Sequence, residues 1–164
     1  MMLFQAVLVL ATVLCSLVAG FLFAFATVVM PGIKSLDDAA FIRAFQVMDG
    51  VIQGYQPLFM LVWIGSALST IAAAALGGWK LAGLDRLLLV FAALIFLLGV
   101  QAPTATINIP MNDALQTLDT RTMSEPALKR AREDFESRWN QWNIMRTVFA
   151  TMVTVLLIVL LLRL

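Results

Sequence analysis

The sequence predicts an all-α integral membrane protein: a four-helix bundle with an amphipathic helix between the first two spans and a long final helix projecting from the membrane. Apolar residues make up 62% of the chain and charged residues 13%, against about 25% charged in soluble domains. Three of the four charge-free stretches reach the roughly 20 residues that a helix needs to cross a hydrocarbon core of about 30 Å. The stretches are Met1–Ile33, Gly50–Trp79, Leu87–Asn112 and Thr147–Leu162. We expect one domain, residues 1–164.

The first span is expected over about residues 3–29, because Pro31 and Gly32 follow it directly. Small and weakly polar side chains recur along it at helical spacing. Such side chains favour contact with neighbouring helices in a membrane, because they permit close approach and hydrogen bonding. We therefore expect one stripe to face inward: Gln5, Thr12, Ser16, Ala19, Phe23 and Thr27.

An amphipathic helix is expected over about residues 36–53, where Ser35 and Asp38 form a start that resembles a capping box. Its apolar face holds Phe41, Ala44, Phe45, Met48, Ile52 and Tyr55. Its polar side holds Arg43, Gln46, Asp49 and Gln53. Two placements remain open, one on the bilayer surface and one over the mouth of the bundle.

The second and third spans are expected over about residues 57–76 and 84–103. The third is almost wholly aliphatic, and an extramembrane loop and helix are expected to follow it over residues 104–144. The second span repeats the inward stripe of the first, with Phe59, Ser66, Thr70, Ala73 and Gly77.

The final helix combines a charged first half with an apolar second half. Neither proline nor glycine follows Pro126, so we expect one helix from about Glu125 onward, roughly 60 Å long at 1.5 Å per residue. Ser124 is the expected N-cap. The fourth span is expected over about residues 145–164, where Arg146 and Arg163 can extend their charged groups toward the two interfaces.

Four spans place residues 33–55 and 103–143 on one side of the membrane, and the two termini with the connection 77–86 on the other. Most strongly polar side chains therefore gather at one end, where we expect any site to lie. The positive-inside rule favours the cytoplasm for this loop-rich end. Acidic residues dilute the basic charge of its long loop, however, and the compact connection is basic, so the opposite orientation remains open.

Composition disfavours several classes of function. The chain has no histidine and a single cysteine, Cys15, so it lacks the commonest metal and haem ligand and any thiol pair. We expect no metal site and no cofactor. The net charge of +1, without a basic surface interleaved with aromatic residues, gives no reason to expect a nucleic-acid partner.

Two polar clusters lie outside the spans, one before the second span and one after the third. Gln46, Asp49 and Gln53 lie at spacings of 3 and 4 along one edge of the amphipathic helix, and the alternative is a solvated helix face. Asn108 and Asn112 follow the third span, where both could simply belong to a turn or a helix cap. An asparagine near membrane depth must find hydrogen-bond partners, so Asn108 is the stronger candidate.

The third cluster, on the final helix, is the strongest. Spacings of 3, 4 and 7 bring Trp139, Trp142 and Arg146 together, with Asn143 beside them. The alternative is an interfacial belt of aromatic residues with a snorkelling arginine. A belt does not require the neighbouring asparagine, so a site remains the sharper interpretation.

Six segments of the chain are similar to those of a known family: Gly20–Phe25, Val29–Gly32, Ala44–Gln46, Pro57–Phe59, Asn108–Asn112 and Trp139–Arg146. They resemble the anthrone oxygenase family, nearly from end to end of the chain. That family comprises small four-helix membrane proteins. Its fungal members oxidise anthrones to anthraquinones, and most bacterial members have no assigned activity.

The resemblance implies a cofactor-free oxygenase acting on a hydrophobic phenolic small molecule that arrives from membrane lipid, in a multi-pass protein of the bacterial inner (plasma) membrane. Asp49 would be the base, and Arg146, with Asn143 and Asn108, would stabilise the oxyanion. The residues expected to bind the substrate are Trp139, Trp142, Gln46, Gln53 and Asn112.

A non-catalytic membrane module is the alternative. It would bind a lipid or a quinone-like molecule, or pair with a second copy or another membrane protein, and Asp49 and Arg146 would form a structural ion pair. A transporter or channel is disfavoured, because the spans lack paired broken helices and any intramembrane acid or base.

Overall fold

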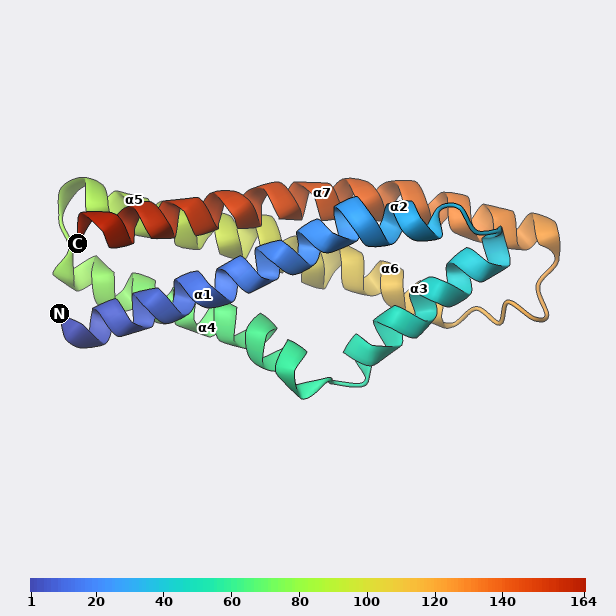
Figure 1. Ribbon diagram of the computed structural model, residues 1–164, viewed down its shortest axis with the longest axis horizontal. Helices are drawn as coiled ribbons and strands as arrows, with labels where there is room; N and C mark the ends of the chain where they lie inside the picture. Colours follow the sequence, from blue (N-terminus) through green and yellow to red (C-terminus); the bar gives the residue numbers. More distant parts are fainter.

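The computed structural model describes residues 1–164 and contains only helices and their connections. Both termini lie at one end of the elongated molecule, beside the turn that joins the second and third long helices (Figure 1). Four helical segments are long and apolar enough to cross a membrane, which confirms the predicted helical membrane bundle: Met2–Ile33, Pro57–Lys80, Gly83–Gln116 and Glu125–Arg163.

Three of the elements are π-helical stretches, labelled η, which continue neighbouring α-helices. In chain order the elements are α1 (Met2–Ala24), η1 (Phe25–Val29), α2 (Met30–Ile33), α3 (Asp38–Gln53), α4 (Pro57–Lys80), α5 (Gly83–Ile95), η2 (Phe96–Gln101), η3 (Thr104–Asn108), α6 (Ile109–Gln116) and α7 (Glu125–Arg163).

Each π-helical stretch ends two residues before a proline: η1 before Pro31, η2 before Pro103 and η3 before Pro110. In an α-helix a proline ring clashes with the carbonyl group four residues earlier, and here that carbonyl lies in the widened turn. The residue before each proline donates its N–H to the oxygen five residues earlier: Met30 to Phe25, Ala102 to Leu97 and Ile109 to Thr104. The first and third helices therefore run past their expected ends near residues 29 and 103.

The membrane half is held by an apolar core to which α1, α4, α5 and α7 all contribute, from Phe4 near one end to Leu22 and Val100 toward the other. The stripe expected on the second span is largely confirmed, since Ser66, Thr70, Ala73 and Gly77 are all buried. Gly77 is required by packing, because a Cβ atom there would collide with the side chains of Leu89 and Phe4.

The stripe expected on the first span is wrong in part. Thr12 and Ala19 are buried, but Ser16, Phe23 and Thr27 are exposed. The hydroxyl groups of Ser16 and Thr27 donate to carbonyl oxygens of their own helix, those of Val13 and Phe23. A hydroxyl satisfied in this way needs no partner on a neighbouring helix, so its presence does not identify the packed face.

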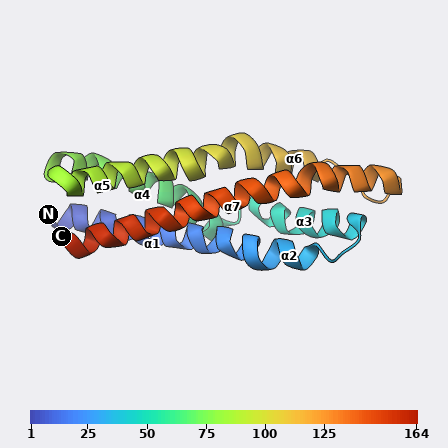
Figure 2. The same cartoon turned by 90° about the horizontal axis from the view of Figure 1, so that it is seen from above.

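The other half of the molecule has its own core, so the charged half of α7 is not a bare stalk. α3 and α6 pack along α7 in this distal half (Figure 2). α3 thus covers the end of the bundle, which is one of the two placements left open by its sequence. Eight buried residues form the distal core: Met30, Phe41, Ile42, Phe45, Leu115, Leu128, Phe135 and Trp139.

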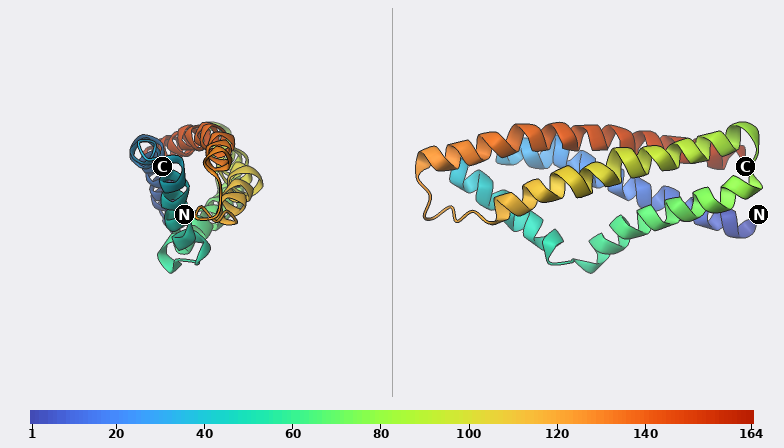
Figure 3. Two further views of the ribbon diagram at one scale, coloured as in Figure 1. Left: turned by 90° about the vertical axis from the view of Figure 1, so that its right-hand side faces the viewer. Right: turned by 180° about the vertical axis from the view of Figure 1, so that it is seen from behind.

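α3 begins two residues later than expected, at Asp38, and ends at a sharp corner. The N-cap is Asp37, not Ser35, and its carboxylate accepts the N–H of Ala40 at 2.8 Å. From the distal end α3 runs back toward the membrane half and meets α4 at residues 54–56. The two helices form an open V whose apex points away from α7 (Figures 1 and 3).

Candidate functional site

A cavity of about 400 Å³ lies where the membrane core meets the distal core. It is bounded by the corner of α3 and α4, by η3 and α6, and by the middle of α7. Among the nine residues that the sequence predicts for a site, seven line this cavity: Asp49, Gln53, Asn108, Asn112, Trp139, Asn143 and Arg146. Residues from three separate parts of the chain therefore meet in one place.

The first charged group of the cavity is the carboxylate of Asp49, which is 4% exposed. Its Oδ1 accepts a hydrogen bond from Asn112 Nδ2 at 2.7 Å. Its Oδ2 accepts from Gln53 Nε2 at 2.7 Å and from Gln116 Nε2 at 3.1 Å. An ionised carboxylate has about four acceptor positions, so neutral amides occupy three and leave one open on Oδ1.

Asp49 lies on the packed side of α3, whereas the sequence analysis assigned it to the polar side. Phe41, Phe45 and Asp49 follow one another at intervals of four, so they share one face of the helix. Because the two phenylalanines are buried against α7, the carboxylate that follows them is buried too.

The second charged group is the guanidinium of Arg146, which is also 4% exposed. Its Nη1 donates to Thr104 Oγ1 at 2.8 Å, and its Nη2 donates to Asn143 Oδ1 at 3.2 Å. Its Nε has no partner. The amide nitrogen of Asn143 donates to the carbonyl oxygen of Leu22 at 3.1 Å, which anchors the asparagine that receives the guanidinium.

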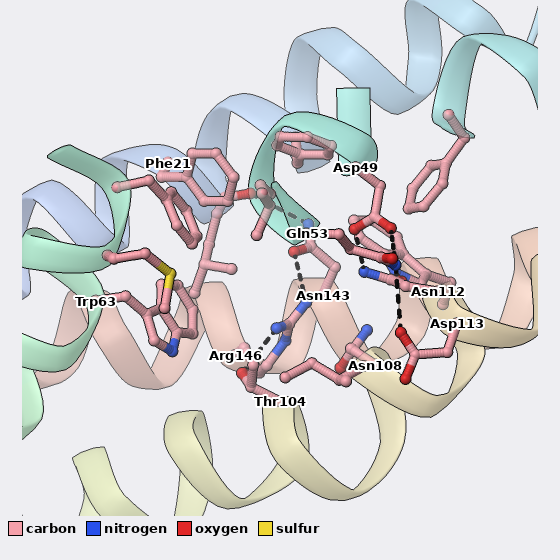
Figure 4. A pocket seen from close by; sticks show the side chains of 18 of the residues that line it. Phe21, Asp49, Gln53, Trp63, Thr104, Asn108, Asn112, Asp113, Asn143 and Arg146 are labelled. Carbon is pink, nitrogen blue, oxygen red and sulfur yellow. Dashed lines mark hydrogen bonds between the residues drawn. The ribbon is translucent and has the colours of Figure 1, made fainter. Parts of the chain in front are cut away.

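Asn108 lies one helical turn from Thr104, which binds Arg146, and one from Asn112, which binds Asp49 (Figure 4). It is 2% exposed, and both its amide oxygen and its amide nitrogen lack a hydrogen-bond partner. Burying an unsatisfied amide costs on the order of 1–3 kcal/mol. A donor and an acceptor are therefore left open on the cavity wall beside Arg146 and Asp49.

Aromatic rings form the remaining walls. On the side of α4, Phe59 stacks on Trp63 with ring centroids 5.6 Å apart, and Phe21 meets Phe59 edge-on at 5.2 Å. On the distal side, Trp139 meets Phe45 edge-on at 5.2 Å. The indole Nε1 of Trp139 also donates to Asn112 Oδ1 at 2.8 Å, which fixes the amide that in turn donates to Asp49.

Gln46 and Trp142 do not line the cavity. Gln46 Nε2 donates to the carbonyl oxygens of Leu115 and Leu118 at 2.8 and 2.9 Å, so its side chain secures the end of α6. Trp142 is half-buried at the edge of the inward face of α7. The residues of α7 that meet at the cavity are Trp139, Asn143 and Arg146.

Three polar residues of the site were missed from the sequence: Thr104, which binds Arg146, Gln116, which binds Asp49, and Asp113, which accepts a hydrogen bond from Gln53. The signal was present, because Thr104, Asn108, Asn112 and Gln116 recur at intervals of four. The prolines that flank this segment ordinarily mark helix ends, so the spacing alone does not predict one continuous helix face. The aromatic rings on α1 and α4, Phe21 and Trp63 among them, carried no signal that set them apart from other apolar positions.

These features define a helical membrane protein with a partly closed, polar-lined cavity at the junction of its membrane and distal halves. The family model of anthrone oxygenase matches residues 52–156. The chain therefore belongs to the anthrone oxygenase family, as its sequence motifs indicated. The matched region includes Asn108, Asn143 and Arg146, and Asp49 lies just before it. Comparison with curated proteins and with solved structures gave no match.

Proposed function

We propose that this chain is a cofactor-independent oxygenase that converts the CH₂ group of a hydrophobic phenolic substrate, such as an anthrone, to a ketone. The single observation that supports this proposal is the arrangement of Asp49 and Arg146. Both side chains are buried and both line one cavity, yet neither has an oppositely charged partner.

Two opposite buried charges would ordinarily stabilise each other by direct contact, because removing one partner of a buried pair costs about 3–5 kcal/mol. Here neutral amide and hydroxyl groups hold each charge in place instead. The ion pair that the non-catalytic alternative required is not formed. A substrate that gives a proton to the carboxylate of Asp49 and develops negative charge on an oxygen near the guanidinium of Arg146 would complement both charged groups.

The proposed reaction begins when the open acceptor position of Asp49 takes a proton from the substrate. The electron-rich enolate that remains gives electrons to O₂, a C–O bond forms at the former CH₂ carbon, and the proton returns to give a hydroperoxide. That carbon then loses its second hydrogen as the O–O bond breaks, which yields the ketone and water. The sum is R₂CH₂ + O₂ → R₂C=O + H₂O, and O₂ is the only oxidant.

The other residues act on these two charges. Arg146 Nε and the amide of Asn108 are open donors for the developing oxyanion, and fixed donors of this kind can lower a barrier by several kcal/mol. Asn143 and Thr104 orient Arg146, while Asn112, Gln53 and Gln116 orient Asp49. The rings of Phe21, Phe59, Trp63 and Trp139 would hold a flat apolar substrate.

We further propose that the protein resides in the bacterial inner membrane and receives its substrate from membrane lipid. The cavity wall includes Phe59 and Trp63 of α4, an apolar helix long enough to span the bilayer. A second copy of the chain or another membrane protein remains a prediction for its partners.

The test uses the full chain in lipid nanodiscs with dithranol, a dihydroxyanthrone, as substrate. Oxygen uptake and anthraquinone formation are measured after subtraction of the spontaneous oxidation. Asp49→Asn is expected to lower turnover by about 10²-fold or more, the usual contribution of a general base. Asp134→Asn is the matched control, because this carboxylate is exposed on α7 away from the cavity. An Asp49→Asn variant as fast as wild type would overturn the proposal.

A further inference from the structure

The corner between α3 and α4 contains a strained tyrosine. After the last residue of α3, Tyr55 N–H donates to Ile52 O and Gln56 N–H donates to Val51 O. This is the pattern of a Schellman motif, whose left-handed position is usually glycine. Here that position is Tyr55, with φ of 56°, although Gly54 lies directly before it with φ of −73°.

Packing within the chain does not compensate this strain. The left-handed conformation is disfavoured for residues with a Cβ atom, and Tyr55 is 74% exposed. Its hydroxyl group makes no hydrogen bond to another part of the chain. Glycine would form the same corner without strain, so the structure of the free protein gives no reason for the tyrosine ring.

Tyr55 also belongs to the lining of the cavity. Four residues both line the cavity and are exposed, so together they form its rim: Gln53, Tyr55, Ile109 and Asp113. Gln53 Nε2 donates to Asp113 Oδ1 at 3.2 Å across one part of the rim. Tyr55 and Ile109 supply the apolar part of the rim. A flat aromatic molecule bound in the cavity would have one face uncovered at this part.

We propose that Tyr55 is a specificity-determining residue whose ring covers the bound aromatic substrate at the mouth of the cavity. This inference rests on the proposed function, because it concerns the same substrate. Strained residues persist where function requires them. The left-handed backbone at Tyr55 places an aromatic ring on the rim of the cavity, where it can close over the ligand.

An interfacial anchor is the competing explanation, since tyrosine is enriched where membrane helices meet water. An anchor acts on the bilayer alone and does not alter the affinity of the cavity. The two explanations therefore differ in the dissociation constant of a cavity ligand.

The experiment measures binding of dithranol to the full chain in nanodiscs without oxygen, from the quenching of tryptophan fluorescence. Trp63 and Trp139 line the cavity and report occupancy. Tyr55→Gly and Tyr55→Asn both remove the ring and tolerate a positive φ. We expect the dissociation constant to rise about tenfold in both, the size of effect that loss of one well-placed aromatic contact produces. Tyr55→Phe keeps the ring and is expected to stay within about twofold of wild type.

Trp79→Leu is the control for anchoring, because Trp79 is 92% exposed at the opposite end of α4. It is expected to leave the dissociation constant unchanged. Wild-type affinity in both Tyr55→Gly and Tyr55→Asn would overturn the role of Tyr55, and so would a wild-type chain that shows no saturable quenching. Neither result depends on turnover, whereas the proposed reaction fails when Asp49→Asn retains full turnover, so the two failures are distinguishable.

Discussion

Asp49 on α3 and Arg146 on α7 line the same cavity, but no ion pair joins them. Asn108 lines it as well, with both amide atoms unsatisfied. The fold keeps these groups apart by giving each of the two charges its own neutral partners. Because buried polar atoms are left without partners, this arrangement lowers the free energy of unfolding of the free protein.

Asn108→Leu should make the protein more stable and less active. The substitution replaces an unsatisfied amide by an apolar side chain of similar size, which we expect to raise the free energy of unfolding by about 1 kcal/mol. Turnover of dithranol should fall about tenfold with the loss of one oxyanion donor. Thermal unfolding in detergent and oxygen uptake measure the two effects. Asn140→Leu, half-buried outside the cavity, should change neither, and a destabilised Asn108→Leu would contradict the prediction.

Removing the charge of Arg146 should abolish most of the turnover. Arg146→Met retains much of the side-chain volume, and we expect turnover to fall by about 10²–10³-fold, the range seen for lost oxyanion donors. Arg146→Lys retains the charge but lacks the planar guanidinium that binds Thr104 and Asn143 at the same time. Its turnover should therefore lie between those of wild type and Arg146→Met. Arg138→Met, on the exposed side of α7, is the control. Equal turnover in Arg146→Met and wild type would exclude an electrostatic role.

Trp139→Phe should lower turnover mainly through kcat. The indole Nε1 donates to Asn112 Oδ1 at 2.8 Å, and Asn112 Nδ2 donates to Asp49 Oδ1 at 2.7 Å. Phenylalanine keeps the packing but removes the first of these hydrogen bonds, so the side-chain amide of Asn112 is no longer fixed. We expect kcat to fall about tenfold and the free energy of unfolding to fall by about 1–2 kcal/mol. Trp142→Phe is the same substitution outside the cavity, and steady-state kinetics compare the two. If Trp142→Phe alone lowers turnover, the substrate-binding role predicted for Trp142 from the sequence is restored.

Arg132→Gln should destabilise the distal half. Arg132 donates to the carbonyl oxygens of Lys34 and Leu36 and to the carboxylates of Asp38 and Glu136, and its guanidinium lies 4.4 Å from the centroid of the Phe41 ring. Loss of this network should cost about 2–4 kcal/mol of unfolding free energy. Lys129→Gln removes only an exposed ion pair of 3.9 Å, which is worth about 0.5 kcal/mol. Limited proteolysis near residues 34–37 would report the loosening, and equal resistance of both variants would argue against it.

The long helices were predictable because charge and length determine them directly. A stretch such as Met1–Ile33 carries no charge and is longer than a membrane helix requires, and the absence of proline after Pro126 favours one continuous final helix. The class of fold follows from these facts alone. The family resemblance rested on short motifs and is confirmed by the match over residues 52–156.

The prolines account for what the sequence did not reveal about the third helix. Prolines such as Pro103 and Pro110 ordinarily mark helix ends. Here a widened turn before each proline lets the helix continue, and whether such a turn forms depends on the packing of the whole bundle. A helix that ends near residue 103 leaves no role for the four-residue spacing that aligns Thr104 with Gln116. The left-handed backbone at Tyr55 was equally unpredictable, because neighbouring Gly54 is the residue that sequence rules favour there.

The register of the site on the third helix depends on the widened turn over Thr104–Asn108. An α-helix rotates by about 40° beyond a full turn every four residues, so side chains at that spacing drift around its axis, and the widened turn offsets this drift. Such a turn amounts to one extra residue in an otherwise regular helix. Deleting a single codon at Ala105 would therefore restore a regular α-helix, in which Thr104 O still accepts the N–H of Ile109 and everything upstream keeps its rotation. The same deletion within the regular turns of α6 would rotate Thr104 by about 100° relative to Gln116, so that the two could no longer contact Arg146 and Asp49 together.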